Sequence, residues 1–295
     1  MGIPTTEAKL QFKYNATLGE CPVWDVEKEL LYWVDILSGE LYCYDPKKEE
    51  NSVYQIDEHV GSLALRKKGG AVLALKSGFA LYDFGKQKIT HLTDPIAHLP
   101  NQRFNDGKCD PQGCFWAGTL SYDVQPGVGS LFCLNQNFTV SKKLGKLTIP
   151  NGMAWDTDPS TFYFIDSPDR TIYSFDFDEK TGEVSKRSEV FELDEEDAVP
   201  DGMTMDTEGK LWVALYNGYK VLRIDPDNGD IMHQVLLPVP QVTSCTFGGP
   251  EMNELYITTA REHMTDKDIE EFPLSGSLFK VTLPYKGTPP ARFMG

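Results

Sequence analysis

The segment Val199-Pro200-Asp201-Gly202-Met203-Thr204-Met205-Asp206 places a carboxylate at the start of a run that otherwise has the residues of a buried strand. Asp201 stands five residues before a second aspartate, Asp206. The same spacing recurs in three other segments, which pair Asn151 with Asp156, Asn105 with Asp110, and Glu20 with Asp25. Four predicted strands therefore begin, in one register, with an oxygen-bearing side chain.

Short strands rich in Leu, Tyr, Trp and Val recur along the chain, beginning at residues 31, 71, 115, 162, 211 and 255. A further strand of similar composition follows each of them, and both sets are bounded by Gly, Pro, Asp or Asn. Units of about 40 to 50 residues with four strands each are typical of β-propeller blades. The sequence therefore predicts an all-β fold, a six-bladed β-propeller with four-stranded blades, in which residues 1–295 form a single domain.

The two ends of the chain predict how the ring closes. Residues 9–13 precede the first complete unit, and the last unit ends near Leu283. We therefore expect the N-terminal strand to complete the last blade. Helical periodicity is not sustained along the chain, and the best helical segment is residues 265–271, in a polar insertion.

Composition and charge exclude several classes of function. A net charge of −16 argues against a nucleic-acid partner, which would require clustered Lys and Arg. The N-terminus lacks the pattern of a secretory signal, and no apolar run is long enough to span a membrane, so we expect a cytoplasmic protein with no membrane association. The six cysteines are expected to be reduced and mostly buried; Cys109 and Cys114 lack the further ligands of a zinc motif.

Propeller geometry gives the opening pattern a function, because the first strand of each blade lines the central channel. The residues at equal register are Glu20, Gly61, Asn105, Asn151, Asp201 and Ser244, and we call them the axial ring. Two buried carboxylates require a countercharge, which a divalent cation supplies. Oxygen donors without His or Cys favour Ca²⁺, with Mg²⁺, Mn²⁺ and Zn²⁺ as alternatives. In the other interpretation, these side chains cap strand starts and hydrogen-bond one another.

Motifs of several common enzyme classes and of nucleotide-binding proteins are absent from the sequence. The five histidines do not form a His-Glu-x-x-His pair, which argues against a zincin-type protease. The sequence also lacks the Gly-x-Ser-x-Gly elbow of serine hydrolases and the glycine-rich loops that bind nucleotides.

Residues 201–229, 244–249 and 256–262 are similar to animal regucalcins in particular, and four segments resemble the senescence-marker-protein/gluconolactonase/regucalcin family as a whole. They are Leu18-Gly19-Glu20-Cys21-Pro22-Val23-Trp24, Arg103-Phe104-Asn105-Asp106-Gly107-Lys108, Ile149-Pro150-Asn151-Gly152-Met153-Ala154-Trp155 and Pro200-Asp201-Gly202-Met203. The resemblance runs from about residue 10 to the C-terminus. It implies a six-bladed propeller and a metal-dependent lactonase that acts on sugar lactones such as gluconolactone.

The resemblance also implies roles for individual residues. It assigns the metal to Glu20, Asn151 and Asp201, and the substrate hydroxyls to Arg103, Asn105 and Asp123. Asp123 stands where the family is expected to have Glu, and the loop 121–129 that carries it is expected to act as a lid that tunes substrate choice.

The chemistry of these residue types fits those roles. The metal would polarise the lactone carbonyl while Asp201 acts as the general base that takes a proton from water. Arg103 would donate hydrogen bonds to the substrate, and Asp106 would orient the site from beside Asn105.

Two other functions stay open at this point. One is a phosphotriesterase-like hydrolase on the same metal site, and the other is a non-enzymatic calcium-binding protein. In the favoured interpretation, the partners are one divalent metal ion and a small lactone, and the protein is a monomer or weak dimer.

Overall fold

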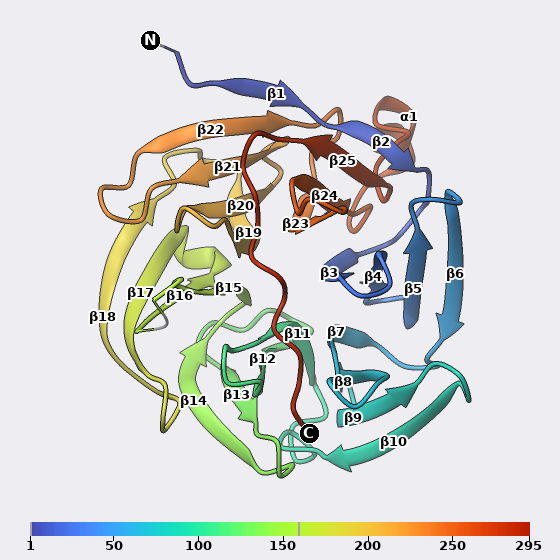
Figure 1. Ribbon diagram of the computed structural model, residues 1–295, viewed down its shortest axis with the longest axis vertical. Coiled ribbons are helices and arrows are strands. Elements are labelled where there is room, and N and C mark those ends of the chain that lie inside the picture. The colour runs from blue at the N-terminus through green and yellow to red at the C-terminus, as the bar shows by residue number, and fades with distance from the viewer. Residues whose placement is uncertain (1, 159) are drawn as a thin grey trace.

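Six β-sheets stand around a central axis in the computed structural model, which describes residues 2–158 and 160–295 (Figure 1). Within each sheet, strands that are consecutive in sequence are hydrogen-bonded neighbours, from the inner strand at the axis to the outer edge. The predicted six-bladed β-propeller is confirmed.

The blades are numbered in chain order by their inner strands. Blade 1 contains β3 (Gly19–Asp25), β4 (Leu30–Asp35), β5 (Glu40–Asp45) and β6 (Glu50–Gln55); blade 2 contains β7 (Val60–Leu65), β8 (Ala71–Leu75), β9 (Gly78–Asp83) and β10 (Lys88–Thr93); blade 3 contains β11 (Gln102–Cys109), β12 (Phe115–Ser121), β13 (Gly129–Leu134) and β14 (Val140–Leu147). Blade 4 contains β15 (Pro150–Trp155), β16 (Thr161–Asp166), β17 (Thr171–Asp178) and β18 (Glu183–Glu192); blade 5 contains β19 (Val199–Met205), β20 (Leu211–Tyr216), β21 (Lys220–Ile224) and β22 (Ile231–Leu236); blade 6 contains β23 (Val242–Gly248), β24 (Glu254–Thr259) and β25 (Leu278–Thr282).

The N-terminal segment closes the ring and also reaches a second blade. Strand β2 (Lys9–Phe12) pairs antiparallel with β25 and completes blade 6, as predicted. Strand β1 (Thr5–Glu7) was not predicted; it pairs parallel with β22 at the outer edge of blade 5. The three polar residues of β1 are too few to show the alternation of a strand, so the sequence does not predict it. Their pairing depends on the open edge that β22 offers.

The aspartate that follows each axial residue by five positions has a structural role, best seen in blades 3 and 5. The Asp110 Oδ1 accepts the backbone N–H groups of Gln112 (3.0 Å) and Cys114 (2.9 Å), and its Oδ2 accepts the Trp116 indole N–H at 2.8 Å. Asp206 repeats these contacts in blade 5, with Glu208, Lys210 and Trp212 as donors. Both indoles are fully buried between blades. Each aspartate therefore closes the turn after the inner strand and fixes the tryptophan that packs there.

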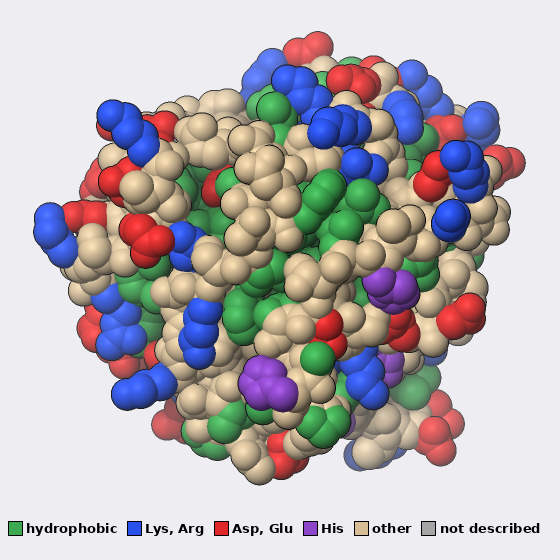
Figure 2. Space-filling view, turned by 90° about the horizontal axis from the view of Figure 1, so that it is seen from below, with side chains coloured by type: hydrophobic (Ala, Val, Ile, Leu, Met, Phe, Trp, Pro, Cys, Tyr) green, Lys and Arg blue, Asp and Glu red, His purple; other side chains and the backbone are tan. Residues whose placement is uncertain are grey.

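The predicted helix is confirmed as α1 (Asp266–Glu271), and Thr265 and Asp268 form a capping box at its N-terminus. A 3₁₀ turn, η1 (Ser167–Asp169), follows β16. Within the described residues, the helices are all too short or too polar to cross a bilayer. On the face shown in Figure 2, acidic and basic side chains are interspersed.

The C-terminal segment crosses one end of the channel. Figure 1 shows it running over the centre of the ring. It is fastened at Gly287, which bridges to Asp206, and at Phe293, which bridges to Arg66. Residues 288–291 between these anchors line the space beneath.

Candidate active site

A β-bulge lies at or beside the axial ring position in every blade. The register between the first two strands shifts between Glu20 and Val23, Val60 and Ser62, Phe104 and Gly107, Asn151 and Met153, Pro200 and Met203, and Val242 and Ser244. Bulges of this kind turn side chains away from the regular alternation of a strand. Six bulges at one level therefore aim the ring side chains at the axis.

Glycines beside the ring allow neighbouring inner strands to approach closely. A Cβ atom on Gly152 would lie 2.7 Å from the Asp201 carbonyl oxygen. A Cβ atom on Gly202 would lie 2.1 Å from the Ser244 hydroxyl oxygen. Both contacts are too short for any side chain, so glycine is required where the strands of blades 4, 5 and 6 meet.

The amides of Asn105 and Asn151, in the neighbouring blades 3 and 4, are joined by a hydrogen bond at the axis. The Asn105 Nδ2 donates to the Asn151 Oδ1 at 2.8 Å, and the Arg103 Nη1 donates to the Asn105 Oδ1 at 2.8 Å. The Asn151 Nδ2 donates in turn to the Ser167 hydroxyl at 2.8 Å, which donates to the Pro200 carbonyl oxygen at 2.7 Å. Ser167 was not predicted as a site residue, because it follows a second strand instead of opening a first one.

Three carboxyl groups lie buried near one another with little countercharge. Burial, and then the charge of Asp106, raise the pKa of Glu20 from 4.5 to about 8. Burial, followed by the charge of Glu20, raises the pKa of Asp201 well above its ordinary value. The Asp201 Oδ1 is also buried without a hydrogen-bond partner among the described residues. Burial and the neighbouring carboxyl groups thus disfavour the ionised forms of Glu20 and Asp201.

Two basic residues lie close to these carboxyl groups. Arg103 is buried, and its charge opposes the rise in the pKa of Glu20. The Lys108 ammonium donates to the Met203 carbonyl oxygen at 2.6 Å and opposes the rise in the pKa of Asp106. Lys108 was not predicted as a site residue, since a lysine that alternates with apolar residues in a strand is expected at the surface.

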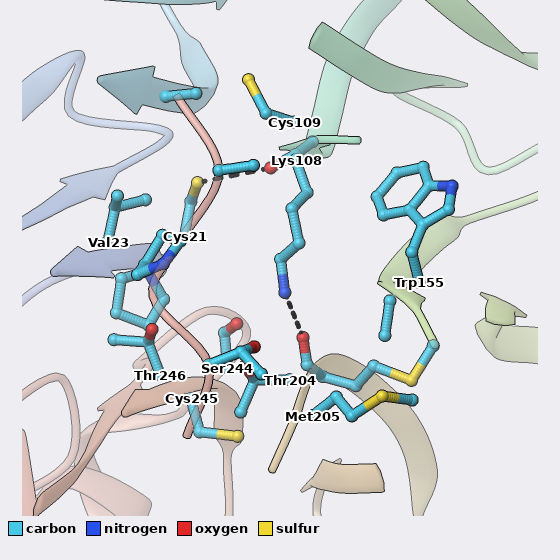
Figure 3. A pocket seen from close by; sticks show the side chains of 18 of the residues that line it. Cys21, Val23, Lys108, Cys109, Trp155, Thr204, Met205, Ser244, Cys245 and Thr246 are labelled. Atoms are coloured by element: carbon cyan, nitrogen blue, oxygen red, sulfur yellow. Dashed lines mark hydrogen bonds between the residues drawn. The ribbon is translucent and has the colours of Figure 1, made fainter. Parts of the chain in front are cut away.

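The channel widens beyond the ring into a cavity of about 240 Å³, on the side covered by the C-terminal segment. Lys108 extends across it from β11 toward β19 (Figure 3). Asp106 also lines this cavity, whereas Glu20, Asn151 and Asp201 do not. Asp106, which was predicted to orient the site, therefore lies on the side of the ring that faces Lys108.

Asp123 is not brought to the ring in this structure. It is exposed in the loop after β12, where its carboxylate accepts hydrogen bonds from Asn101 at 2.8 Å and Gln125 at 2.7 Å. Its neighbour Tyr122 shares a hydrogen bond of 2.8 Å with the His59 Nδ1 across blades 2 and 3. Loop residues have no register that sequence analysis could follow, so this pair was not predicted.

The donor set fits a hard divalent cation. Glu20, Asn151 and Asp201 offer only oxygen, which Ca²⁺ and Mg²⁺ prefer. The unpaired Asp201 Oδ1 has a free acceptor position, and the Asn151 Oδ1 keeps a second lone pair beside the bond from Asn105. A bound cation would also offset the repulsion that raises the pKa values of Glu20 and Asp201.

Comparisons with known proteins identify relatives over nearly the full length of the chain. Residues 18–261 match the model of the SMP-30/Gluconolactonase/LRE-like region. The regucalcin of Xenopus laevis is 41% identical over 284 residues, which cover 94% of this chain and 95% of the relative. A protein of Bacillus subtilis (strain 168) named "Putative sugar lactone lactonase YvrE" is 38% identical over 289 residues, which cover 98% of this chain and 99% of the relative.

A solved structure has the same architecture. It is that of a calcium-binding protein, regucalcin, from Agrobacterium tumefaciens str. C58, with a TM-score of 0.94 and 26% identity over 99% of both chains. Sequence and fold thus agree over nearly the full length, and the chain belongs to the SMP-30/gluconolactonase/LRE-like family.

Proposed function

We propose that this protein is a divalent-metal-dependent hydrolase of sugar lactones. The observation that carries the proposal is the unpaired, buried Asp201 Oδ1 beside the carboxyl group of Glu20. An isolated pair of this kind is costly to bury, and a cation offsets that cost. The family, which includes gluconolactonases, and the name of the Bacillus relative support a lactone as the substrate.

Glu20, Asn151 and Asp201 would hold the cation. When bound, it supplies Lewis-acid polarisation of the lactone carbonyl. The hydrogen bond from the Asn105 Nδ2 fixes the orientation of the Asn151 Oδ1, which would bind the cation together with the two carboxylates. Ca²⁺ is the expected ion, since the donors are all oxygen.

The residues of the chain supply the remaining chemistry. Within residues 2–158 and 160–295, the Arg103 guanidinium donates hydrogen bonds only from Nη1, so Nε and Nη2 are available to the substrate hydroxyls or to the carboxylate product. Asp201 would also accept a proton from the attacking water. A role for Asp123 in substrate binding requires that its bonds to Asn101 and Gln125 break.

The test is a matrix of metals and lactones. Protein stripped with a chelator is assayed with Ca²⁺, Mg²⁺, Mn²⁺ or Zn²⁺ and with gluconolactone or a second aldonolactone. We expect turnover that depends on the metal, and its loss in Asn151→Ala and Asp201→Asn. Asn137→Ala, at an exposed position, is the matched control and should retain full activity.

A second candidate is a calcium-binding protein without catalysis, which is favoured by the description of the Agrobacterium structure. Calorimetric calcium binding that is lost in Asp201→Asn, together with no turnover of any lactone in the matrix, would favour that function. Turnover of diisopropyl fluorophosphate in preference to every lactone would instead favour a phosphotriesterase.

A further inference from the structure

Blades 3 and 5 contain the same turn with different residues around it. In both, an aspartate closes the turn and accepts the indole N–H of the tryptophan six positions later. Four positions after the aspartate, blade 5 has Lys210 and blade 3 has Cys114. Opposite the tryptophan on the next strand, blade 5 has Arg223 and blade 3 has Cys133. Two thiols thus replace two cations.

In blade 5 these cations neutralise buried acid. The Arg223 Nε donates to the Asp206 Oδ2 at 2.7 Å, and both side chains are buried. The Asp206 Oδ2 therefore accepts two hydrogen bonds, one from Trp212 and one from Arg223. The Lys210 ammonium donates a hydrogen bond to the Asp225 Oδ1 at 2.7 Å.

In blade 3 the corresponding position next to the aspartate has no cation. The Asp110 Oδ2 accepts only the Trp116 indole N–H, and Asp110 forms no ion pair within residues 2–158 and 160–295. The nearby Lys143 lies over the Trp116 ring at 5.8 Å from its centre and bonds to Glu183 at 2.7 Å. One lone pair of the Asp110 Oδ2 is thus available where Asp206 accepts Arg223.

The two sulfur atoms and the Asp110 carboxylate form a set of three potential metal donors. One carboxylate oxygen of Asp110 and the Sγ atoms of Cys114 and Cys133 lie within 4.8 Å of one another. With Zn–S distances of about 2.3 Å and Zn–O distances of about 2.1 Å, the ligands of a tetrahedral zinc ion are roughly 3.5–4 Å apart. Small side-chain movements are enough to close the set around one ion.

We propose that Asp110, Cys114 and Cys133 form a site for one thiophilic divalent cation such as Zn²⁺, separate from the axial ring. The ion takes the place that the Arg223 guanidinium has beside Asp206 in blade 5. Both thiols release a proton to the solvent as the sulfur–metal bonds form. Cys114 is only half-buried, so a water molecule can reach the fourth position from the solvent.

A disulfide is the competing chemistry for two neighbouring thiols, and the register argues against it. Cys133 faces Trp116, so Cys114 lies diagonally across the strand pair. Diagonal residues have Cα atoms about 7–8 Å apart, whereas a disulfide requires about 4.4–6.8 Å. A bridging ion spans this separation without a shift of the backbone.

Cadmium titration of the reduced, metal-free protein tests the site, because cadmium–thiolate bonds absorb in the ultraviolet and cadmium–oxygen bonds do not. We expect an absorption step that saturates at one ion per chain. Cys114→Ser and Cys133→Ser should each abolish it. Cys43→Ser, which removes another half-buried thiol, and Asp201→Asn should leave it unchanged.

A double variant distinguishes loss of the metal site from loss of folding. Cys114→Lys with Cys133→Arg supplies blade 3 with the cations of blade 5, and it should fold and show neither the absorption nor the cadmium-induced rise in Tm of the wild type. The proposal is overturned if the absorption persists in Cys114→Ser, if the wild type shows none with excess cadmium, or if peptide mass mapping of freshly purified protein shows a disulfide between Cys114 and Cys133.

Discussion

Asn105 and Asn151 join blades 3 and 4 at the axis through one hydrogen bond, in which the Asn105 Nδ2 donates to the Asn151 Oδ1 at 2.8 Å. The bond orients an oxygen that we assign to the metal. In Asn105→Ala the Asn151 Oδ1 loses its donor, so the Asn151 amide is held only by its bond to Ser167, and Arg103 loses an acceptor. We expect lactone kcat/KM to fall about 10-fold to 100-fold, as for other partners of metal ligands. Wild-type kinetics in Asn105→Ala would contradict the assignment, and Asn137→Ala is the control.

Asp201→Asn should separate stability from activity. In the metal-free protein the substitution removes the cost of burying an acidic group beside Glu20, so the free energy of unfolding at neutral pH should rise. Added Ca²⁺ should stabilise the wild type and leave the variant unchanged. Urea unfolding with chelator and with Ca²⁺ measures both effects. Equal stabilisation of the two proteins by Ca²⁺ would place the ion elsewhere.

The metal-free protein should lose stability as the pH rises. The pKa of Glu20 is 4.5 when unfolded and about 8 when folded. A raised folded pKa favours the folded state below about pH 4.5, and this contribution is lost as the pH rises through about 8. In Glu20→Gln, this contribution to the dependence of stability on pH should disappear. Thermal unfolding of chelator-treated protein from pH 5 to pH 9 measures how stability depends on pH, with Glu270→Gln, at an exposed position, as the control. Parallel curves for Glu20→Gln and the wild type would refute the prediction.

Arg223→Ala should destabilise blade 5 strongly. It leaves the Asp206 carboxylate buried without its ion-pair partner, and breaking a buried pair typically costs about 3–5 kcal/mol. Lys186→Ala breaks an exposed pair with Asp176 and should cost no more than about 1 kcal/mol. Urea unfolding compares the two variants. Similar losses in both would show that Asp206 does not depend on Arg223.

Removal of the N-terminal strands should open the ring. Deletion of residues 1–14 removes both β1 and β2, so blade 6 loses its outer strand. Deletion of residues 1–7 removes only the additional pairing with blade 5. We expect the longer deletion to lower the urea midpoint much more than the shorter one. An unchanged midpoint after the longer deletion would show that β2 does not close the ring.

The repeating strands made the fold predictable from the sequence, and the equal register of the inner strands gave the axial ring. The spacing did not reveal why the second aspartate of each pair recurs. In Asp110 and Asp206 the reason is a contact with a tryptophan on the next strand, which appears only after the hairpin has formed.

Residues outside that register were not predictable. Tyr122 and His59 meet through loops of two different blades. In the sequence, Cys114 could be considered as a metal ligand only together with its neighbour Cys109. In the structure, its partner is Cys133 on the adjacent strand. For Asp123, the family resemblance implied a role in substrate binding, but the conformation of its loop depends on local bonds to Asn101 and Gln125.

The C-terminal segment gives the propeller two unequal faces. Its anchors at Gly287 and Phe293 lie over one end of the channel, and Gly295 accepts hydrogen bonds from Arg66 beside them. A surface linker attached after Gly295 would therefore hold the molecule by its covered face. In a biosensor or a packed-bed reactor, protein immobilised through this end would present the opposite face to the flowing solution, whereas attachment through random lysines would not select a face.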